Sequence, residues 1–124
     1  MILNNVSHHQ KLIEWSGYNQ WRLLYRATRD GKSASNFHNK CDNQGKTIVI
    51  IKVKQYVFGG FANCNWKSSG QYIHDTGCWL FSLVNPNNNS PAKFSNTNSS
   101  YSMYCGSNYG PTFGGGHDIC KLLL

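Results

Sequence analysis

Hydrophobic and polar positions alternate along several short stretches of the chain, a pattern typical of half-buried β-strands. The most apolar stretch, residues 47–53 (TIVIIKV), is rich in β-branched residues and apolar on both faces, so it predicts a strand in the interior of a sheet. Residues 56–61 follow closely enough to pair with it as a hairpin, and residues 78–84 alternate again. A further short strand is expected at residues 101–105.

Two short helices are expected before the first long strand. The first is predicted to begin at Ser7, whose side chain would form a capping box with Gln10, and to end at Gly17. The second is predicted to follow Ser33, whose hydroxyl can accept from the amide of Asn36. Helices this short cannot form the core alone and should lie at its periphery.

Connecting segments complete the pattern. Residues 21–28 hold aromatic and aliphatic side chains suited to a strand or its lead-in, and residues 63–76 read as a polar loop. Short strands separated by turn signals, with two helical pieces, predict a mainly β fold with short peripheral helices (α+β), a β-sandwich. We divide the chain into residues 1–20, an N-terminal lead-in with a short helix, and residues 21–124, the domain proper.

Composition limits the class of protein. A chain of 124 residues forms one domain at most. It has no apolar run near the ~20 residues that span a bilayer, and its start lacks the pattern of a secretory signal. We therefore expect a cytoplasmic protein without membrane insertion.

The net charge of +7 raises the question of nucleic-acid binding. The twelve basic residues are scattered, however, and no RNA-recognition, KH or helix-turn-helix pattern accompanies them. A nucleic-acid partner is therefore disfavoured. A carbohydrate- or nucleic-acid-binding module that uses an exposed Trp66 and the basic surface stays open as a weaker alternative.

The five cysteines form no CxxC pair, and an odd number leaves one unpaired in any disulfide scheme. His117 and Cys120 have ligand-like spacing, but a structural zinc site needs four ligands. We expect reduced, mostly buried thiols and neither a metal nor a cofactor. Cys41 and Cys64 are the two candidates for a reactive thiol.

A glycine-rich block near the C-terminus and a charged turn supply the remaining candidate site residues. They are Arg29, Asp30, Gly114, Gly115, Gly116, His117 and Asp118. The block lacks the Lys-Ser/Thr of a phosphate loop, and neighbours on a strand point to opposite faces, so His117 and Asp118 are not placed to act as a catalytic pair. We expect the glycines to allow close packing beneath aromatic rings. The Arg29–Asp30 turn is either a recognition point or an ordinary surface pair.

Four segments resemble, in order, the signature of the TLDc domain of oxidation-resistance proteins. They are residues 23–42 (LLYRATRDGKSASNFHNKCD), 56–61 (YVFGGF), 79–83 (WLFSL) and 109–118 (YGPTFGGGHD). The resemblance covers most of the chain from about Leu12, and the Asn-rich spacers resemble protist versions. Because family members continue beyond the last block through further strands, we expect the sandwich to be incomplete at the C-terminus.

The resemblance implies a two-sheet antiparallel β-sandwich, a link to oxidative-stress resistance, and protein partners that include subunits of the vacuolar proton pump (V-ATPase). It brings no established catalytic residues. The leading hypothesis is therefore a non-enzymatic protein-interaction domain. The alternative is an enzyme that uses His117, Asp118 or a cysteine thiol in peroxide or hydrolytic chemistry.

Overall fold

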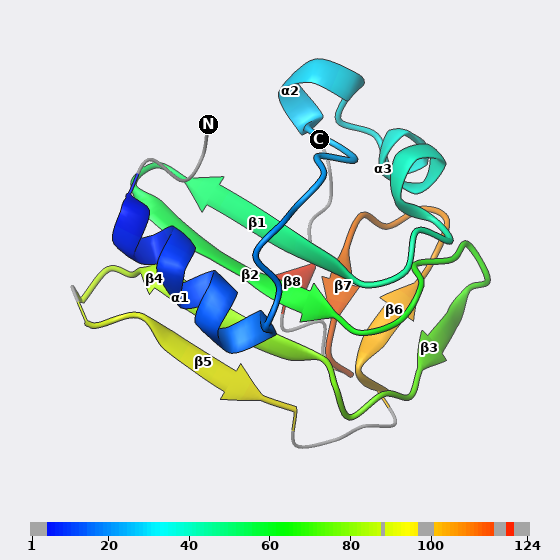
Figure 1. Cartoon of the computed structure of the whole chain (residues 1–124). Helices are drawn as coiled ribbons and strands as arrows, with labels where there is room; N and C mark the ends of the chain where they lie inside the picture. Colours follow the sequence, from blue (N-terminus) through cyan, green and yellow to red (C-terminus); the bar gives the residue numbers. More distant parts are fainter. Residues whose placement is uncertain (1–4, 88, 97–100, 116–118, 121–124) are drawn as a thin grey trace.

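A computed structural model describes residues 5–87, 89–96, 101–115 and 119–120. Within these residues the helices are α1 (Val6–Ser16), α2 (Ala27–Asp30) and α3 (Ala34–Cys41). The strands are β1 (Thr47–Val53), β2 (Tyr56–Ala62), β3 (Gln71–Ile73), β4 (Trp79–Val84), β5 (Ala92–Ser95), β6 (Met103–Cys105), β7 (Thr112–Phe113) and β8 (Ile119–Cys120). They form two antiparallel sheets with the orders β1-β2-β4-β5 and β3-β6-β7-β8 (Figure 1).

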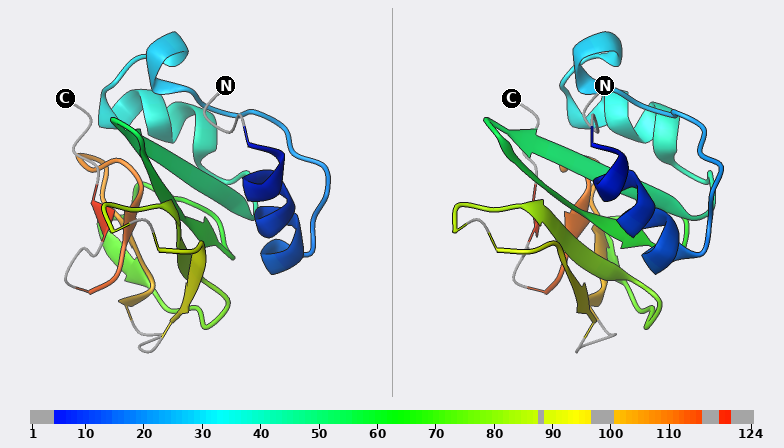
Figure 2. Two further views of the ribbon diagram at one scale, coloured as in Figure 1. Left: turned by 90° about the vertical axis from the view of Figure 1, so that its left-hand side faces the viewer. Right: turned by 60° about the vertical axis from the view of Figure 1, so that its left-hand side comes forward.

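The first sheet carries an apolar layer on each of its faces, since side chains alternate along a strand. One layer lies between the sheet and α1, and it contains Leu12, Val57, Phe61, Trp79, Phe81 and Leu83. The other lies toward α3 and the second sheet, and it contains Phe37, Cys41, Ala62, Trp66, Cys78, Met103, Cys105 and Phe113. The two side views show α1 on one side of the first sheet and the second sheet on the other (Figure 2). The predicted mainly β sandwich with short helices is confirmed.

Two adjacent glycines in β2 allow aromatic rings to approach the first sheet from both sides. A Cβ atom on Gly59 would collide with the backbone oxygen of Val49 and approach the Phe81 ring to 2.8 Å. One on Gly60 would come within 2.7–3.0 Å of the Phe113 ring. From the sequence, close packing beneath aromatic rings was expected of the C-terminal glycine block. The structure shows close packing at the Gly59–Gly60 pair.

Several predicted elements need correction. Residues 47–53 do form a strand and pair with β2 in a hairpin, but β1 lies at the end of the sheet and not in its interior. Both faces of β1 are apolar because an apolar layer covers each side of the sheet: Val49 packs against one layer, and Ile48 and Ile50 pack against the other. Residues 21–28, expected to be a strand or its lead-in, are irregular up to Arg26, and α2 begins at Ala27. The expected loop at residues 63–76 contains β3, and β5 was not predicted.

The helix ends agree in part with the sequence analysis. The hydroxyl of Ser33 accepts from Asn36 N–H at 3.1 Å, as predicted, and Gly17 ends α1 in the left-handed conformation with φ 78°. The predicted cap at Ser7 is wrong, because the Asn5 side chain accepts from Ser7 N–H at 2.8 Å and α1 begins at Val6. Asn caps helices as well as Ser does, and the N-cap of α1 lies at Asn5, two residues before the predicted position.

Candidate functional site

Residues 17–26, which we call the strap, join α1 to α2 and pass β1 on the outside of the molecule (Figures 1 and 2). Leu24 and Tyr25 hold the strap in place by packing against the layer that contains Phe37. The rings of Tyr25 and Phe37 meet edge to face with centroids 5.7 Å apart, and the Tyr25 hydroxyl donates to the Gly31 carbonyl at 2.6 Å. The strap is therefore an anchored segment with a defined outer surface.

The outer surface of the strap exposes large apolar side chains. Tyr18, Trp21 and Leu23 are 45%, 42% and 52% exposed. The rings of Tyr18 and Trp21 meet edge to face at 6.3 Å, so the two aromatics form one feature. An anchored group of exposed aromatics is the kind of surface that protein interfaces use, because it contributes a large contact area at low entropic cost.

Positive charge surrounds these aromatics. Lys46 Nζ donates to the Tyr18 hydroxyl at 3.2 Å, and Arg22 Nη2 donates to Gln44 Oε1 at 3.2 Å. Both partners are neutral, so these contacts leave the cationic charges uncompensated. Along the sequence the basic residues are scattered. The fold brings Lys46 beside the strap, a contact that sequence separation hides.

The Arg29–Asp30 pair, a predicted site, lies at the end of the strap. Arg29 Nε and Nη2 donate to the two Asp30 carboxylate oxygens at 2.7 and 2.6 Å, and the Arg26 amide donates to the same carboxylate at 2.9 Å. The bonds from Arg29, followed by the bond from Arg26, lower the pKa of Asp30 to about 2. The Asp30 side chain is only 11% exposed. The carboxylate therefore fixes the turn of α2, and Arg29 is the member of the pair that faces solvent.

A buried histidine that sequence reasoning missed links α3 to the segment between β6 and β7. His38 Nδ1 lies 2.7 Å from Asp42 Oδ1, and its Nε2 lies 2.9 and 2.8 Å from the carbonyl oxygens of Gly106 and Tyr109. Because carboxylates and carbonyls both accept, each ring nitrogen is placed to donate. With Nε2 occupied by carbonyls, His38 is a structural link and not a general base. The i, i+4 spacing of His38 and Asp42 in a predicted helix is the sequence feature that could have indicated this contact.

The glycine block is only partly described. Gly114 has φ 87°, and its amide donates to the Ser102 carbonyl at 3.1 Å, while Gly115 accepts from the Tyr72 hydroxyl at 3.2 Å. Gly116, His117 and Asp118 lie outside the described residues.

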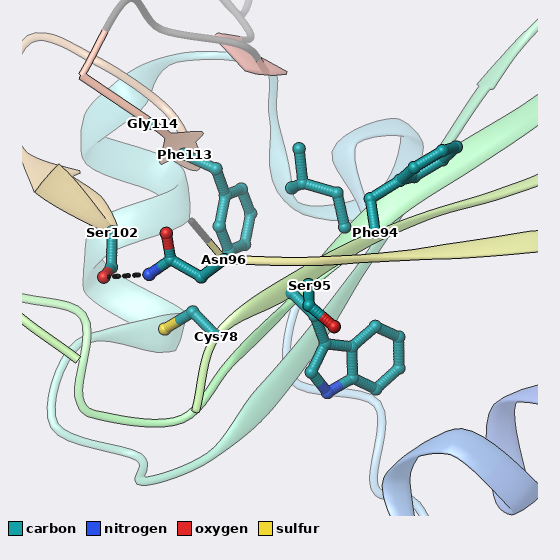
Figure 3. Close-up of a pocket in the computed structure, with 9 residues that line it drawn as sticks. Cys78, Phe94, Ser95, Asn96, Ser102, Phe113 and Gly114 are labelled. Atoms are coloured by element: carbon teal, nitrogen blue, oxygen red, sulfur yellow. Dashed lines mark hydrogen bonds between the residues drawn. The ribbon is translucent and has the colours of Figure 1, made fainter. Parts of the chain in front are cut away.

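Gly114 also lines a cavity of about 200 Å³. The lining residues are Cys78, Trp79, Leu80, Phe94, Ser95, Asn96, Ser102, Phe113 and Gly114 (Figure 3). The polar end of this cavity is formed by Asn96, whose Nδ2 donates to Ser102 Oγ at 2.6 Å. The rest of the wall is largely apolar, with the thiol of Cys78 at its edge (Figure 3).

Two other sequence-based candidates do not fit the structure. Trp66 is 0% exposed and its Nε1 donates to Thr47 Oγ1 at 2.9 Å, so it is a core residue and cannot bind a carbohydrate or a base at the surface. Cys41 is buried, and burial raises its thiol pKa to about 12, which makes it unreactive. Among the described residues no group of three or more His, Cys, Asp or Glu side chains could hold a metal ion, and no helix is long and apolar enough to cross a membrane.

Comparison with known proteins places the chain in a family. The model of the TLDc domain matches residues 2–124. The chain belongs to the TLDc family.

Curated relatives of this TLDc domain include "MTOR-associated protein MEAK7" from several vertebrates. The mouse (Mus musculus) protein is 36% identical over 66 residues, which is 52% of this chain and 14% of the relative. The Xenopus laevis protein is 34% identical over 79 residues, 63% of this chain and 17% of the relative, and the human (Homo sapiens) protein is 32% identical over 65 residues. The matched part is thus a small fraction of each relative.

Proposed function

We propose that this TLDc domain is a non-enzymatic protein-interaction domain that binds an acidic segment of its partner through the strap. The observation that carries the proposal is the anchored Tyr18–Trp21 aromatic pair with the cations of Arg22 and Lys46 beside it. An acidic segment complements these charges, and its apolar side chains would cover the exposed rings. Binding of this kind requires no catalytic group.

Two protein complexes are the candidate partners within this proposal. Resemblance to oxidation-resistance proteins suggests the V-ATPase and a role in protection against oxidative stress. The relatives named as MTOR-associated suggest an MTOR-containing complex. The proposed location of the chain is the cytoplasm, and the free thiols of Cys41, Cys64, Cys78 and Cys105 support it. We also propose that residues 1–20 are an N-terminal lead-in and residues 21–124 the domain proper. The strap, residues 17–26, spans the boundary between these two parts.

The proposal is tested by binding of the immobilised chain to purified V-ATPase and, separately, to a purified MTOR complex. A variant with Trp21→Ala and Arg22→Glu should lose at least about tenfold in affinity for the complex that binds, since central aromatic and charged residues dominate interfaces. The matched control is Lys52→Glu with Val53→Ala, which changes the exposed end of β1. Equal affinity of the strap variant and the control would contradict the proposal. Binding to neither complex would remove both named partners.

A further inference from the structure

The first sheet ends on one side with a strand whose outer edge is open. Among the described residues only β4 pairs with β5, so β5 is the last strand of the order β1-β2-β4-β5. In Figure 1 it forms the lower border of the sheet, whereas the strap passes the strand at the other end, β1. An end strand presents N–H and C=O groups with which a further strand can pair. The outer edge of β5 can therefore accept an extended chain.

The two faces of β5 differ in chemistry, because neighbouring residues of a strand point to opposite faces. Lys93 lies opposite Phe81, and its Nζ is 4.9 Å from the centroid of the Trp79 ring, on the face that α1 covers. Phe94 lies opposite Leu80, on the face toward the second sheet. β5 thus offers a cation on one face and an aromatic ring on the other.

The ring of Phe94 borders the cavity of about 200 Å³. Phe94 is 54% exposed, and Ser95, which also lines the cavity, is exposed, so the cavity opens to solvent beside β5. Phe113 and Asn96 line it across from Phe94 (Figure 3). An apolar cavity of about 150 Å³ can hold benzene, so this space admits one aromatic side chain. A lone exposed aromatic residue is ordinary, but one between an open strand edge and such a cavity is suited to a ligand.

Charge determines which extended chain fits β5. Among the described residues no carboxylate pairs with Lys93, and the chain carries a net charge of +7. A second copy would bring the same positive charge. Two strands of four residues would also pair over less area than the ~1,200–2,000 Å² that stable interfaces bury. An acidic segment is attracted instead, and its carboxylates can reach Lys93.

We propose that β5 binds an extended acidic segment of a protein partner as a further strand of the first sheet. Backbone hydrogen bonds join the segment to β5, and its side chains alternate between the two faces. An aromatic side chain packs beside Phe94 and enters the cavity, and the acidic side chains before and after it lie on the face of Lys93. The segment is recognised by its alternation of acidic and apolar residues around one aromatic residue. No residue of the strap belongs to β5 or lines the cavity, so this site goes beyond the proposed function.

The test uses the synthetic peptide EVEFEVE with blocked ends as the probe and a scrambled peptide of the same composition, EEVFVEE, as its control. Fluorescence anisotropy should show that the parent chain binds the probe at least about tenfold more tightly, because only the probe places its glutamates on one face of a strand. Equal affinity for the two peptides would overturn the proposal. Sedimentation of the chain alone should show a monomer, and a dimer that Phe94→Glu disrupts would assign β5 to a second copy and overturn the proposal too.

Methylation of the probe's backbone tests whether it pairs as a strand. Amides of neighbouring residues in a strand point to opposite edges, so N-methyl groups on alternate residues block one edge only. Of two probes, one methylated on the odd residues and one on the even residues, one should lose at least about tenfold in affinity and the other should keep it. Equal affinities of the two methylated probes would show that the probe does not add to the sheet.

Variants of the chain locate the probe. Phe94→Glu places a negative charge beside the acidic probe and should weaken binding at least about tenfold. Val53→Glu is the matched control, because Val53 is 48% exposed on the opposite end strand and receives the same charge. Equal affinities of these two variants would contradict the site. If circular dichroism shows that Phe94→Glu is unfolded, the methylated probes decide.

The strap variant with Trp21→Ala and Arg22→Glu separates this proposal from the proposed function. It should bind the probe about as tightly as Val53→Glu does, since neither substitution changes β5 or the cavity. The two proposals can therefore fail independently. Loss of probe binding in the strap variant, with binding retained in Phe94→Glu, would show that the probe occupies the strap and would overturn the site at β5.

Discussion

Gly60 shows how a single missing side chain shapes both sheets. Its Cα faces the Phe113 ring, and an added Cβ would meet that ring at 2.7–3.0 Å. We expect Gly60→Ala to lower the free energy of unfolding by about 1–3 kcal/mol, because overpacking forces the ring from its position. Denaturant unfolding measures this. Phe113→Leu is expected to cost less in the Gly60→Ala background than in the parent, and purely additive losses would show that the two residues do not conflict.

Asp30 makes stability depend on pH in acid. Its pKa in the folded chain is about 2, below the usual ~3.9 of an unfolded Asp, because of bonds from Arg29 and then Arg26. A lowered folded pKa contributes stability that is present above about pH 4 and is lost as the pH falls toward 2. Thermal melts of Asp30→Asn between pH 2 and 6 should therefore fall less steeply with acid than those of the parent. Parallel curves would contradict the assignment.

His38 is expected to matter through its hydrogen bonds and not through catalysis. In His38→Gln, the shorter side chain cannot make all the hydrogen bonds that His38 makes to Asp42, Gly106 and Tyr109. At least one buried acceptor is then left without a hydrogen bond. The cost should be about 1–3 kcal/mol of unfolding free energy. His9→Gln, at an exposed position of α1, is the control and should change stability by less than about 0.5 kcal/mol. Similar values for both variants would show that the buried network contributes little.

At the scale of elements, α1 supplies one side of the core. Leu12 is 2% exposed among residues of the first sheet, and Trp15 meets Trp79 edge to face at 6.2 Å. Leu12→Ala should lower the unfolding free energy by about 2–5 kcal/mol, as for other buried leucines. Val6→Ala, on a side chain that is 74% exposed, should have little effect. If Leu12→Ala were as mild as Val6→Ala, α1 would not be part of the cooperative unit.

The elements that the sequence predicts well are those in which local pattern and tertiary burial agree. The alternation in β4 is borne out by burial of Trp79, Phe81 and Leu83, and the β1–β2 hairpin has the expected register partners. β3 and β5 were missed because they are three and four residues long and mostly exposed, so no local periodicity marks them. β3 also pairs with β6, which lies about 30 residues further along the chain. Residues 21–28 were expected to be a strand or its lead-in because their aromatic and aliphatic side chains look like core residues. Their exposure is a tertiary property.

At the scale of the molecule, the candidate sites were predicted only where they lie within one segment. Arg29 and Asp30 are neighbours, so their pairing is readable from the sequence. Lys46 reaches Tyr18 across 28 positions of the sequence, so no local pattern marks their contact. Trp66 was misplaced on the surface because a Trp in a polar segment gives no sign of the core layer that receives it.

Hydrogen–deuterium exchange of the chain, free and in complex with purified V-ATPase, tests the central claim that the strap is the binding surface. We predict slower exchange in the complex across residues 17–26 and at Lys46, because partner atoms would cover the Tyr18–Trp21 pair. Peptides that cover β3, which lies away from the strap, should exchange equally in both states (Figure 1). Protection at β3 with unchanged exchange in the strap would show that the partner binds another surface.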